Sequence, residues 1–254
     1  MINSTEIECN EMIACKYKIQ NHSRMSKTFF CSCHLEEDSS LKDIRKKTVI
    51  SKVIIDRLPL YFRVLRQSRD EGMEIISSEE MGRRLGITPE QIRKDLAAFG
   101  QFGKKGVGYH ILELIFKIGE VLGLDHNWHI AVIGIGHLGW ALAHYRKFDF
   151  LGFKLVAMFD VDPNKIGQCI NGIQVSNLDN LQEVMKEKTI HIGIIAVPEN
   201  HAQETADKLV AAGVRGIWNF ALRKIKVPES VQIINEDLSV GLSALSFHLA
   251  RQVQ

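Results

Sequence analysis

The chain has 254 residues, of which 45% are hydrophobic and 24% are charged. This length allows two domains, and the composition is ordinary for a globular protein. No apolar run approaches the ~20 residues of a membrane-spanning helix, and the N-terminus lacks the basic segment and apolar core of a signal peptide. We therefore expect a cytoplasmic protein without a membrane partner. The net charge of +2 excludes no partner, because its distribution along the chain matters more.

Residues 1–46 show no hydrophobic period and are left unassigned. Cys31 and Cys33 are separated by one residue, whereas zinc-binding pairs usually have two to four between them. We therefore predict a poorly ordered extension without a metal. A metal site that includes His22 and His34, and a reading frame that starts at Met25, are the alternatives. The extension also contains Cys9 and Cys15.

A first helical pattern begins near Ser51. Its apolar residues recur at helical spacing and predict one buried face: Ile54, Leu58, Phe62 and Leu65. Pro59 lies inside this pattern, so we expect a kink or a restart at Leu58.

Two short helices joined by a glycine follow. Ser77 and Glu80 fit a capping box that opens the first helix, and Gly86 ends it. Thr88 opens the second, which has proline at its first helical position. Its apolar face contains Ile92, Leu96 and Phe99. This is a helix-turn-helix pattern, in which the second helix enters the major groove of DNA with its N-terminal residues toward the bases.

Residues 100–109 contain four glycines and two lysines, which we interpret as a basic hairpin, or wing. Between Arg83 and Lys105, six basic residues stand against two acidic ones, a local balance of +4. Phosphate contacts require such a patch. The alternative is the solvated basic face of an ordinary helical domain. A further helix has predicted core residues Leu112, Ile115, Phe116 and Leu122, and residues 123–127 form the linker to a second domain.

The second domain opens with an apolar, β-branched run from His129 that predicts a buried strand. This strand leads into Gly134-Ile-Gly-His-Leu-Gly139 and then into a helix, which is the dinucleotide fingerprint in its expected context. The next strand, residues 153–160, ends in Asp160, where contact with the ribose diol is expected. A carboxylate there repels a 2′-phosphate, so NAD(H) is favoured over NADP(H). The alternative is a nucleotide-free domain with a glycine-rich turn.

Strands and helices alternate in the rest of this domain and predict a doubly wound parallel sheet. The other strands are predicted near residues 173–175, 191–197, 216–220 and 231–235. Helices are predicted after Gly136 and at 178–186 and 199–212. The ligand belongs at the carboxyl ends of the strands, where Val197-Pro198 and Asn219-Phe220 could form walls of the cleft; ordinary loop chemistry is the alternative for that pair. Cys169 is predicted to be a small core residue.

The last segment, residues 237–253, is predicted to be a helix whose apolar surface is wider than one stripe. We therefore expect it to pack between elements or against a second subunit. The predicted divisions are an extension (1–46), a winged helix-turn-helix domain (47–126), a Rossmann-type domain (127–236) and a C-terminal helix (237–254).

From about Thr48 to Phe247, the chain resembles the Rex family of redox-sensing transcriptional repressors. The motifs that carry the resemblance are Arg57-Leu-Pro-Leu-Tyr61, Ile92-Arg-Lys-Asp-Leu96, Phe99-Gly100, Gly103-Lys-Lys-Gly-Val-Gly-Tyr109, Gly134-x-Gly-x-Leu-Gly139, Phe159-Asp-Val-Asp-Pro163, Val197-Pro198, Gly216-Ile-Trp-Asn-Phe220 and Asp237-Leu238. Together these motifs are specific, whereas the fingerprint alone is common. The N-terminal extension departs from the family, which usually lacks one, so its role stays open.

The resemblance implies a homodimer that binds a palindromic operator when NAD⁺ dominates and releases it when NADH rises. It also implies that the C-terminal helix is exchanged between subunits. The implied DNA-binding residues are Ser78, Gln91, Arg93, Lys94, Lys104, Lys105, Gly106 and Tyr109. The implied cofactor-binding residues are Gly134, Ile135, Gly136, His137, Leu138, Gly139, Tyr145, Asp160, Val197, Pro198, Asn219 and Phe220. The implied switch residues are Arg63 of one subunit and Asp237 and Leu238 of the other.

Two other functions remain open on sequence grounds. An NAD-dependent dehydrogenase with a helical appendage would need a general acid or base beside the nicotinamide and a substrate pocket. His137 would face the pyrophosphate instead, and His144 and His191 fit a helix surface and a strand start. A scaffold that binds CoA or a nucleotide without DNA is disfavoured by the basic wing.

Overall fold

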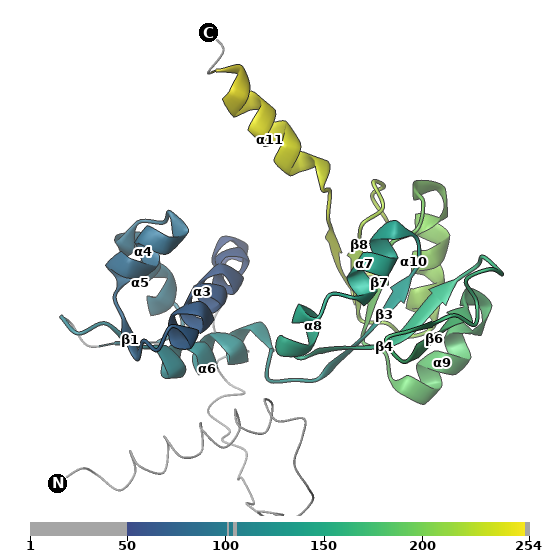
Figure 1. Ribbon diagram of the computed structural model, residues 1–254, viewed down its shortest axis with the longest axis horizontal. Helices are drawn as coiled ribbons and strands as arrows, with labels where there is room; N and C mark the ends of the chain where they lie inside the picture. The colour runs from purple at the N-terminus through teal and green to yellow at the C-terminus, as the bar shows by residue number, and fades with distance from the viewer. Residues whose placement is uncertain (1–49, 101, 104–105, 252–254) are drawn as a thin grey trace, which may run out of the picture. The chain divides into compact units, whose positions relative to one another are not determined.

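The computed structural model describes residues 50–100, 102–103 and 106–251. The predictions for residues 1–46, for Lys104 and for Lys105 therefore lie outside the described residues. The chain divides into two compact units, residues 1–123 and 124–254 (Figure 1). The division falls inside the predicted linker at 123–127.

The first unit is helical with a two-stranded sheet. Its first helix among the described residues, α3 (Lys52–Asp70), runs through Pro59 without a break, so the helix does not restart at Leu58. Its core side is fully buried at Leu58, Tyr61 and Leu65, and this packing outweighs the one hydrogen bond that proline removes. The other elements are β1 (Ile75–Ile76), α4 (Ser78–Leu85), α5 (Pro89–Ala97), β2 (Tyr109–His110) and α6 (Ile111–Leu122).

Helix α6 buries Ile115, as predicted, but its buried side is shifted away from Leu112. Ile111, Ile115 and Ile118 form its buried side, whereas Leu112 is 45% exposed. The prediction that Leu112 is a core residue is therefore wrong. The helix begins directly after β2, whose pairing with β1 directs Ile111 into the core, and the i, i+4, i+7 stripe follows from that start.

The second unit contains a seven-stranded sheet with the order β5-β6-β4-β3-β7-β8-β9. All neighbouring strands are parallel except β5, which pairs antiparallel with β6. Without β5, the order is that of the doubly wound dinucleotide-binding sheet, so the predicted fold class is confirmed. The strands are β3 (Trp128–Ile133), β4 (Phe153–Asp160), β5 (Cys169–Ile170), β6 (Ile173–Asn177), β7 (Ile192–Ile195), β8 (Gly216–Asn219) and β9 (Gln232–Asn235).

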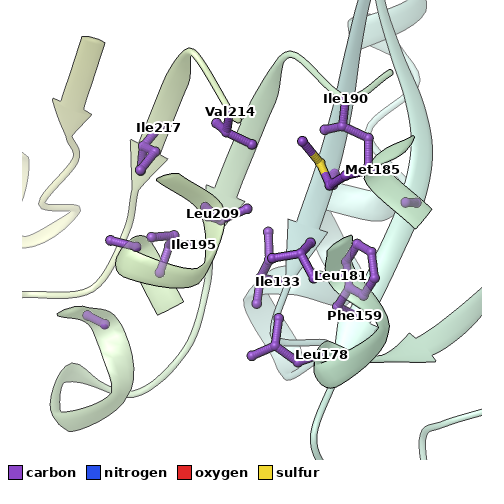
Figure 2. Close-up of a cluster of buried hydrophobic side chains, with 14 of the residues drawn as sticks. Ile133, Phe159, Leu178, Leu181, Met185, Ile190, Ile195, Leu209, Val214 and Ile217 are labelled. Carbon is purple, nitrogen blue, oxygen red and sulfur yellow. The ribbon is translucent and has the colours of Figure 1, made fainter. Parts of the chain in front are cut away.

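Two hydrophobic clusters cover the two faces of this sheet, because alternate side chains of a strand point to opposite faces. Ile133 belongs to the cluster under α9 (Leu181–Lys188) and α10 (Ala202–Ala211), which Figure 2 shows with Phe159 and Leu209. Ile130 and Val132 belong to the other cluster, which includes the end of α7 (His137–Ala143). The short helix α8 (Lys147–Phe150) follows. The fingerprint loop is thus held at the end of a strand that is buried on both faces.

Two segments of this unit are exposed within this chain. Cys169 is exposed because β5 is an edge strand, so the prediction that it is a core residue is wrong. Helix α11 (Ser239–Ala250) has no buried residue within this chain. No helix among the described residues is both long and apolar enough to span a membrane.

His129 on β3 and His191, directly before β7, form a hydrogen-bonded pair that is expected to make stability depend on pH. The backbone N–H of His129 donates to Nδ1 of His191 at 3.0 Å, and Nδ1 of His129 lies 2.9 Å from the carbonyl oxygen of Lys188. Burial, with the nearby His129 and Arg215, lowers the pKa of His191 below its ordinary value. The unfolded chain therefore takes up a proton at a higher pH than the folded chain does. The stabilising contribution is present above about pH 6.5 and is lost as the pH falls from there through the folded pKa.

We predict that the melting temperature of the wild type falls between pH 7.5 and pH 5.5. The melting temperature of the variant His191→Asn should fall less steeply over this pH range. The Asn carbonyl oxygen accepts the same hydrogen bond from the His129 N–H, and it does not titrate. Thermal melts in a buffer series test this, with His144→Asn as the control for a surface histidine. Parallel curves for wild type and His191→Asn would rule out this pair as the source of the pH dependence.

Candidate dinucleotide site and candidate nucleic-acid interface

The glycines after β3 shape a loop that opens toward a ligand. Gly134 has a φ of +91°, and a Cβ there would lie 2.7 Å from the carbonyl oxygen of Ala196. A Cβ at Gly139 would overlap the carbonyl oxygen of Gly134, so α7 can begin this close to the strand only with glycine. By contrast, a Cβ at Gly136 would meet no atom within 4 Å. The loop is therefore packed on its strand side and open at Gly136, as a bound pyrophosphate requires.

Asp160 supports this loop from the next strand. It is 6% exposed, and its Oδ2 accepts from the backbone N–H of Ile135 at 2.7 Å. Its Oδ1 accepts from the N–H groups of Val161 and Asp162 at 2.8 and 2.9 Å, and Nζ of Lys165 lies 3.2 Å from Oδ2. Burial opposes the charge, but the backbone hydrogen bonds and Lys165 outweigh it and lower the pKa of Asp160. The four acceptor positions of the carboxylate are thus filled, and sequence reasoning missed both the bracing of the loop and the part of Lys165.

The other wall of the cleft lies at the ends of β7 and β8. Val197 follows β7, and a Cβ on Gly134 would lie 2.8 Å from its Cγ1, so the two loops meet at the switch point of the sheet. The side chain of Asn219 is fully buried. Its Nδ2 donates to the carbonyl oxygens of Ala221 and Arg223 and to Oδ1 of Asn235, and its Oδ1 accepts from the N–H of Ala221. Asn219 therefore shapes the wall and offers no free polar atom.

The remaining candidate cofactor residues differ in what they expose. Ile135 is buried and its N–H is already bonded to Asp160, whereas His137, the first residue of α7, is exposed. Leu138 is half-buried, Pro198 is exposed, and Phe220 packs against Trp218 with ring centroids 4.5 Å apart. Tyr145 is 48% exposed and lies beside Phe148 at a centroid distance of 5.0 Å.

The two predicted helix starts are capped as expected. The Ser77 hydroxyl accepts from the N–H of Glu80 at 3.1 Å, and the Thr88 hydroxyl accepts from the N–H of Gln91 at 3.3 Å. Gly86 ends α4 in the left-handed conformation. The structure therefore contains two short capped helices, α4 and α5, joined by a tight turn.

Side chains on both flanks of α5 are tied down. On one flank, Arg93 donates to the Ser78 hydroxyl at 2.8 Å and lies 3.1 Å from the Glu79 carboxylate, so two predicted DNA-binding residues bind each other. On the other flank, Nε2 of Gln91 donates to Asp95 at 2.7 Å. Lys94 is exposed between the flanks.

Part of the predicted wing, residues 101, 104 and 105, lies outside the described residues, and the strand that follows it is paired with a distant segment. This strand, β2, pairs with β1, which precedes α4 in the chain. Among the described residues between α5 and β2, Gly103 and Gly108 approach closely, because a Cβ at Gly103 would lie 2.5 Å from the carbonyl oxygen of Gly108. Tyr109 is buried and Gly106 is exposed. Pairing between distant segments decided this arrangement, and the local sequence does not reveal it.

The predicted switch residues belong to different units of the chain. Arg63 is exposed on α3 in the first unit. Asp237 is exposed ahead of α11, and its Oδ1 accepts from the hydroxyl and the backbone N–H of Ser239 at 2.6 and 2.8 Å. These bonds, the hydroxyl first, lower the pKa of Asp237. Asp237 thus caps α11, a role that sequence reasoning missed, and Leu238 is 65% exposed.

Comparisons with known proteins agree with this arrangement. Residues 49–97 match a family model described as "Putative DNA-binding protein N-terminus", and residues 125–222 match one described as "CoA binding domain". The chain is 42% identical to the redox-sensing transcriptional repressor Rex of Syntrophobacter fumaroxidans, over 79% of this chain and 96% of the relative. It is 45% identical to Rex 1 of Thermotoga maritima, over 80% of this chain and 97% of the relative.

Solved structures match over nearly their whole length. A crystal structure of RSP in complex with β-NAD⁺ and operator DNA superposes with a TM-score of 0.76 and 39% identity, over 81% of this chain and 95% of that one. RSP in complex with β-NADH superposes with a TM-score of 0.74 and 37% identity, over 81% of this chain and 97% of that one. A further structure describes RSP as a Rex-family repressor. With relatives above 40% identity that align over nearly their full length, the chain belongs to the Rex family of redox-sensing transcriptional repressors.

Proposed function

We propose that this protein is a transcriptional repressor that senses NADH. It binds a palindromic operator as a homodimer when NAD⁺ dominates, and it releases the operator when the ratio of NADH to NAD⁺ rises. One observation carries the proposal: the chain aligns over 81% of its length with RSP, which was crystallised with both β-NAD⁺ and operator DNA. The dehydrogenase alternative loses support because the relatives are named repressors.

The residues of the two sites fit these ligands. The open side of the loop at Gly136 and the N-terminus of α7 suit a pyrophosphate, and Asp160 lies at the end of β4 beside that loop. Helix α5 and the wing lysines suit the major groove and the phosphates of DNA. We place the protein in the cytoplasm, where bacterial DNA and the NAD(H) pool are both accessible.

The direct test is selection of DNA from genomic fragments by the purified protein, followed by operator titrations with NAD⁺ or with NADH. We expect tight binding with NAD⁺ and at least about tenfold weaker binding with NADH, a coupling in the range typical of allosteric proteins. NAD⁺-dependent oxidation of a small alcohol or hydroxy acid, without selective DNA binding, would instead support the dehydrogenase.

One prediction from the proposed function concerns Lys104 and Lys105 in the wing. Replacing both by alanine should weaken binding to all DNA sequences alike, because wing lysines mainly neutralise phosphates. The slope of log affinity against log salt should become shallower by about one unit for each lost contact. Fluorescence anisotropy between 50 and 300 mM salt measures this slope, with Lys154→Ala on β4 as the control. An unchanged slope would remove the wing from the interface.

A second prediction concerns the choice of cofactor. Lys165 partly neutralises Asp160 and occupies one of its acceptor positions, at 3.2 Å. The variant Lys165→Met should therefore widen the preference for NADH over NADPH, by roughly tenfold if about 1.4 kcal/mol of repulsion of the 2′-phosphate is restored. Asp160→Ala should narrow that preference. Calorimetric titration of both cofactors tests this, and Lys154→Met serves as a control at the opposite end of β4. Unchanged ratios in both variants would mean that another residue sets cofactor choice.

A further inference from the structure

Gln91 and Asp95 form a pair one turn apart on α5. Nε2 of Gln91 lies 2.7 Å from Oδ1 of Asp95. An ionised carboxylate only accepts hydrogen bonds, so the atom of Gln91 that faces it must be the amide nitrogen and not the carbonyl oxygen. The chemistry of the partner thus fixes which end of this amide points inward.

Asp95 is itself held in place by α3. It is 1% exposed, and the guanidinium of Arg57 donates to it twice, from Nε at 2.6 Å and from Nη2 at 2.8 Å. The hydroxyl of Tyr61 donates to it at 2.6 Å. Burial opposes the charge, but Arg57, Tyr61 and Gln91 outweigh burial and keep the pKa of Asp95 low, so the carboxylate stays ionised at neutral pH. Gln91 is therefore tied to an anchor that cannot easily rotate.

This geometry fixes the carbonyl oxygen of Gln91 on the outward side, beside the one N–H of Nε2 that Asp95 does not engage. Among the described residues, its Oε1 has no hydrogen-bond partner, and its first-turn position on α5 is where recognition helices contact base edges. In the major groove, adenine N6 and cytosine N4 are donors, whereas guanine O6 and thymine O4 are acceptors. A glutamine whose amide is not held in place can turn the amide over, so that it binds either a donor or an acceptor group of a base. Here, turning it would place the carbonyl oxygen against the Asp95 carboxylate.

We propose that Asp95 is a positioning residue for base recognition. It holds Gln91 with its carbonyl oxygen outward, so that Gln91 selects a base whose exocyclic amine lies in the major groove, adenine or cytosine, at one position of each half-site and disfavours guanine and thymine there. This inference rests on the proposed function, and it assigns a specificity to a buried residue that does not touch DNA.

The experiment measures the affinity of the full-length protein for an operator series in which each position carries each of the four base pairs. At one position of each half-site, adenine or cytosine should bind about tenfold or more tightly than guanine or thymine. Gln91→Met should abolish that preference and leave the other positions unchanged. Asp95→Asn exchanges one carboxylate oxygen for an amide NH2 group, which can donate to the carbonyl oxygen of Gln91 and lets Gln91 turn over, so the same base preference should shrink. If Asp95 had only a structural role, Asp95→Asn would weaken binding to all operator sequences equally.

Wild-type protein gives a second measurement that does not depend on folding of a variant. Operators with purine or 2-pyrimidinone, which lack the exocyclic amine, should lose as much affinity at that position as Gln91→Met does. Gln67→Met is the matched control, because Gln67 makes the same one-turn pair with Glu71 on α3, at 3.1 Å, outside α5. A preference for guanine or thymine at the Gln91-dependent position, or full affinity for the amine-free operators, would overturn the inference. Failure of the wild type to select any DNA would overturn the proposed function instead.

Discussion

Leu245→Glu in α11 is expected to convert the protein to a monomer and to weaken operator binding by at least about 100-fold. Leu242, Leu245 and Leu249 follow one another along one side of the helix, and Val240 and Phe247 lie on the opposite side. All five are more than half exposed. A helix with large apolar residues on two opposite sides is normally buried, and a second copy of the chain is the partner that family membership supplies.

The size of the effect follows from the two half-sites of a palindrome. In a dimer, binding of the first half-site makes the second contact intramolecular, and such linkage strengthens binding by about 10²–10⁴-fold. A monomer loses that factor even if each α5 is intact. Analytical ultracentrifugation and operator titration measure the two effects. Ser246→Glu is the control, because it adds the same charge on the serine side of α11, where the Ser246 hydroxyl donates to the Ser243 carbonyl oxygen at 2.8 Å. A Leu245→Glu protein that remains dimeric would exclude α11 from the interface.

The elements that the sequence predicted well are those whose signals are local. A strand, three glycines and a helix stand next to one another around Gly134, and capping residues precede α4 and α5 by one position. In each case, the residues that determine the structure lie within one or two turns of it. The alternation of strands and helices then fixed the class of sheet, since parallel strands need crossover helices.

The features that the sequence did not reveal depend on contacts between distant residues. The pairing of β2 with β1 spans the whole helix-turn-helix, and the exposure of Cys169 depends on its strand lying at the edge of the sheet. The anchoring of Asp95 by Arg57 joins residues 38 apart, and the bond from Ile135 to Asp160 joins residues 25 apart. Each of these residues was noticed in a motif, but a motif does not tell which side chain binds which.

The charge of Asp237 is expected to set how strongly NADH releases DNA. The structure adds a second role, because this carboxylate caps α11 through Ser239. Asp237→Ala would remove the cap and the charge together. Asp237→Asn keeps an oxygen that can accept both bonds from Ser239 and removes only the charge. The pair of variants therefore separates the switch role, in which Asp237 binds Arg63 of the other subunit, from the capping role.

If the charged pair favours one arrangement of the dimer, Asp237→Asn should change the coupling between NADH and DNA by roughly tenfold and leave the melting temperature unchanged. Arg63→Gln should change the coupling between NADH and DNA in the same direction, whereas Glu236→Gln, next to Asp237, should leave the coupling unchanged. The measurements are operator affinity at zero and saturating NADH and NADH affinity with and without DNA. Linkage requires that the factor by which NADH weakens operator binding equals the factor by which the operator weakens NADH binding, in every variant. If Asp237→Asn keeps the wild-type ratio and only Asp237→Ala alters it, Asp237 acts as a cap for α11, and the pair with Arg63 is not the switch.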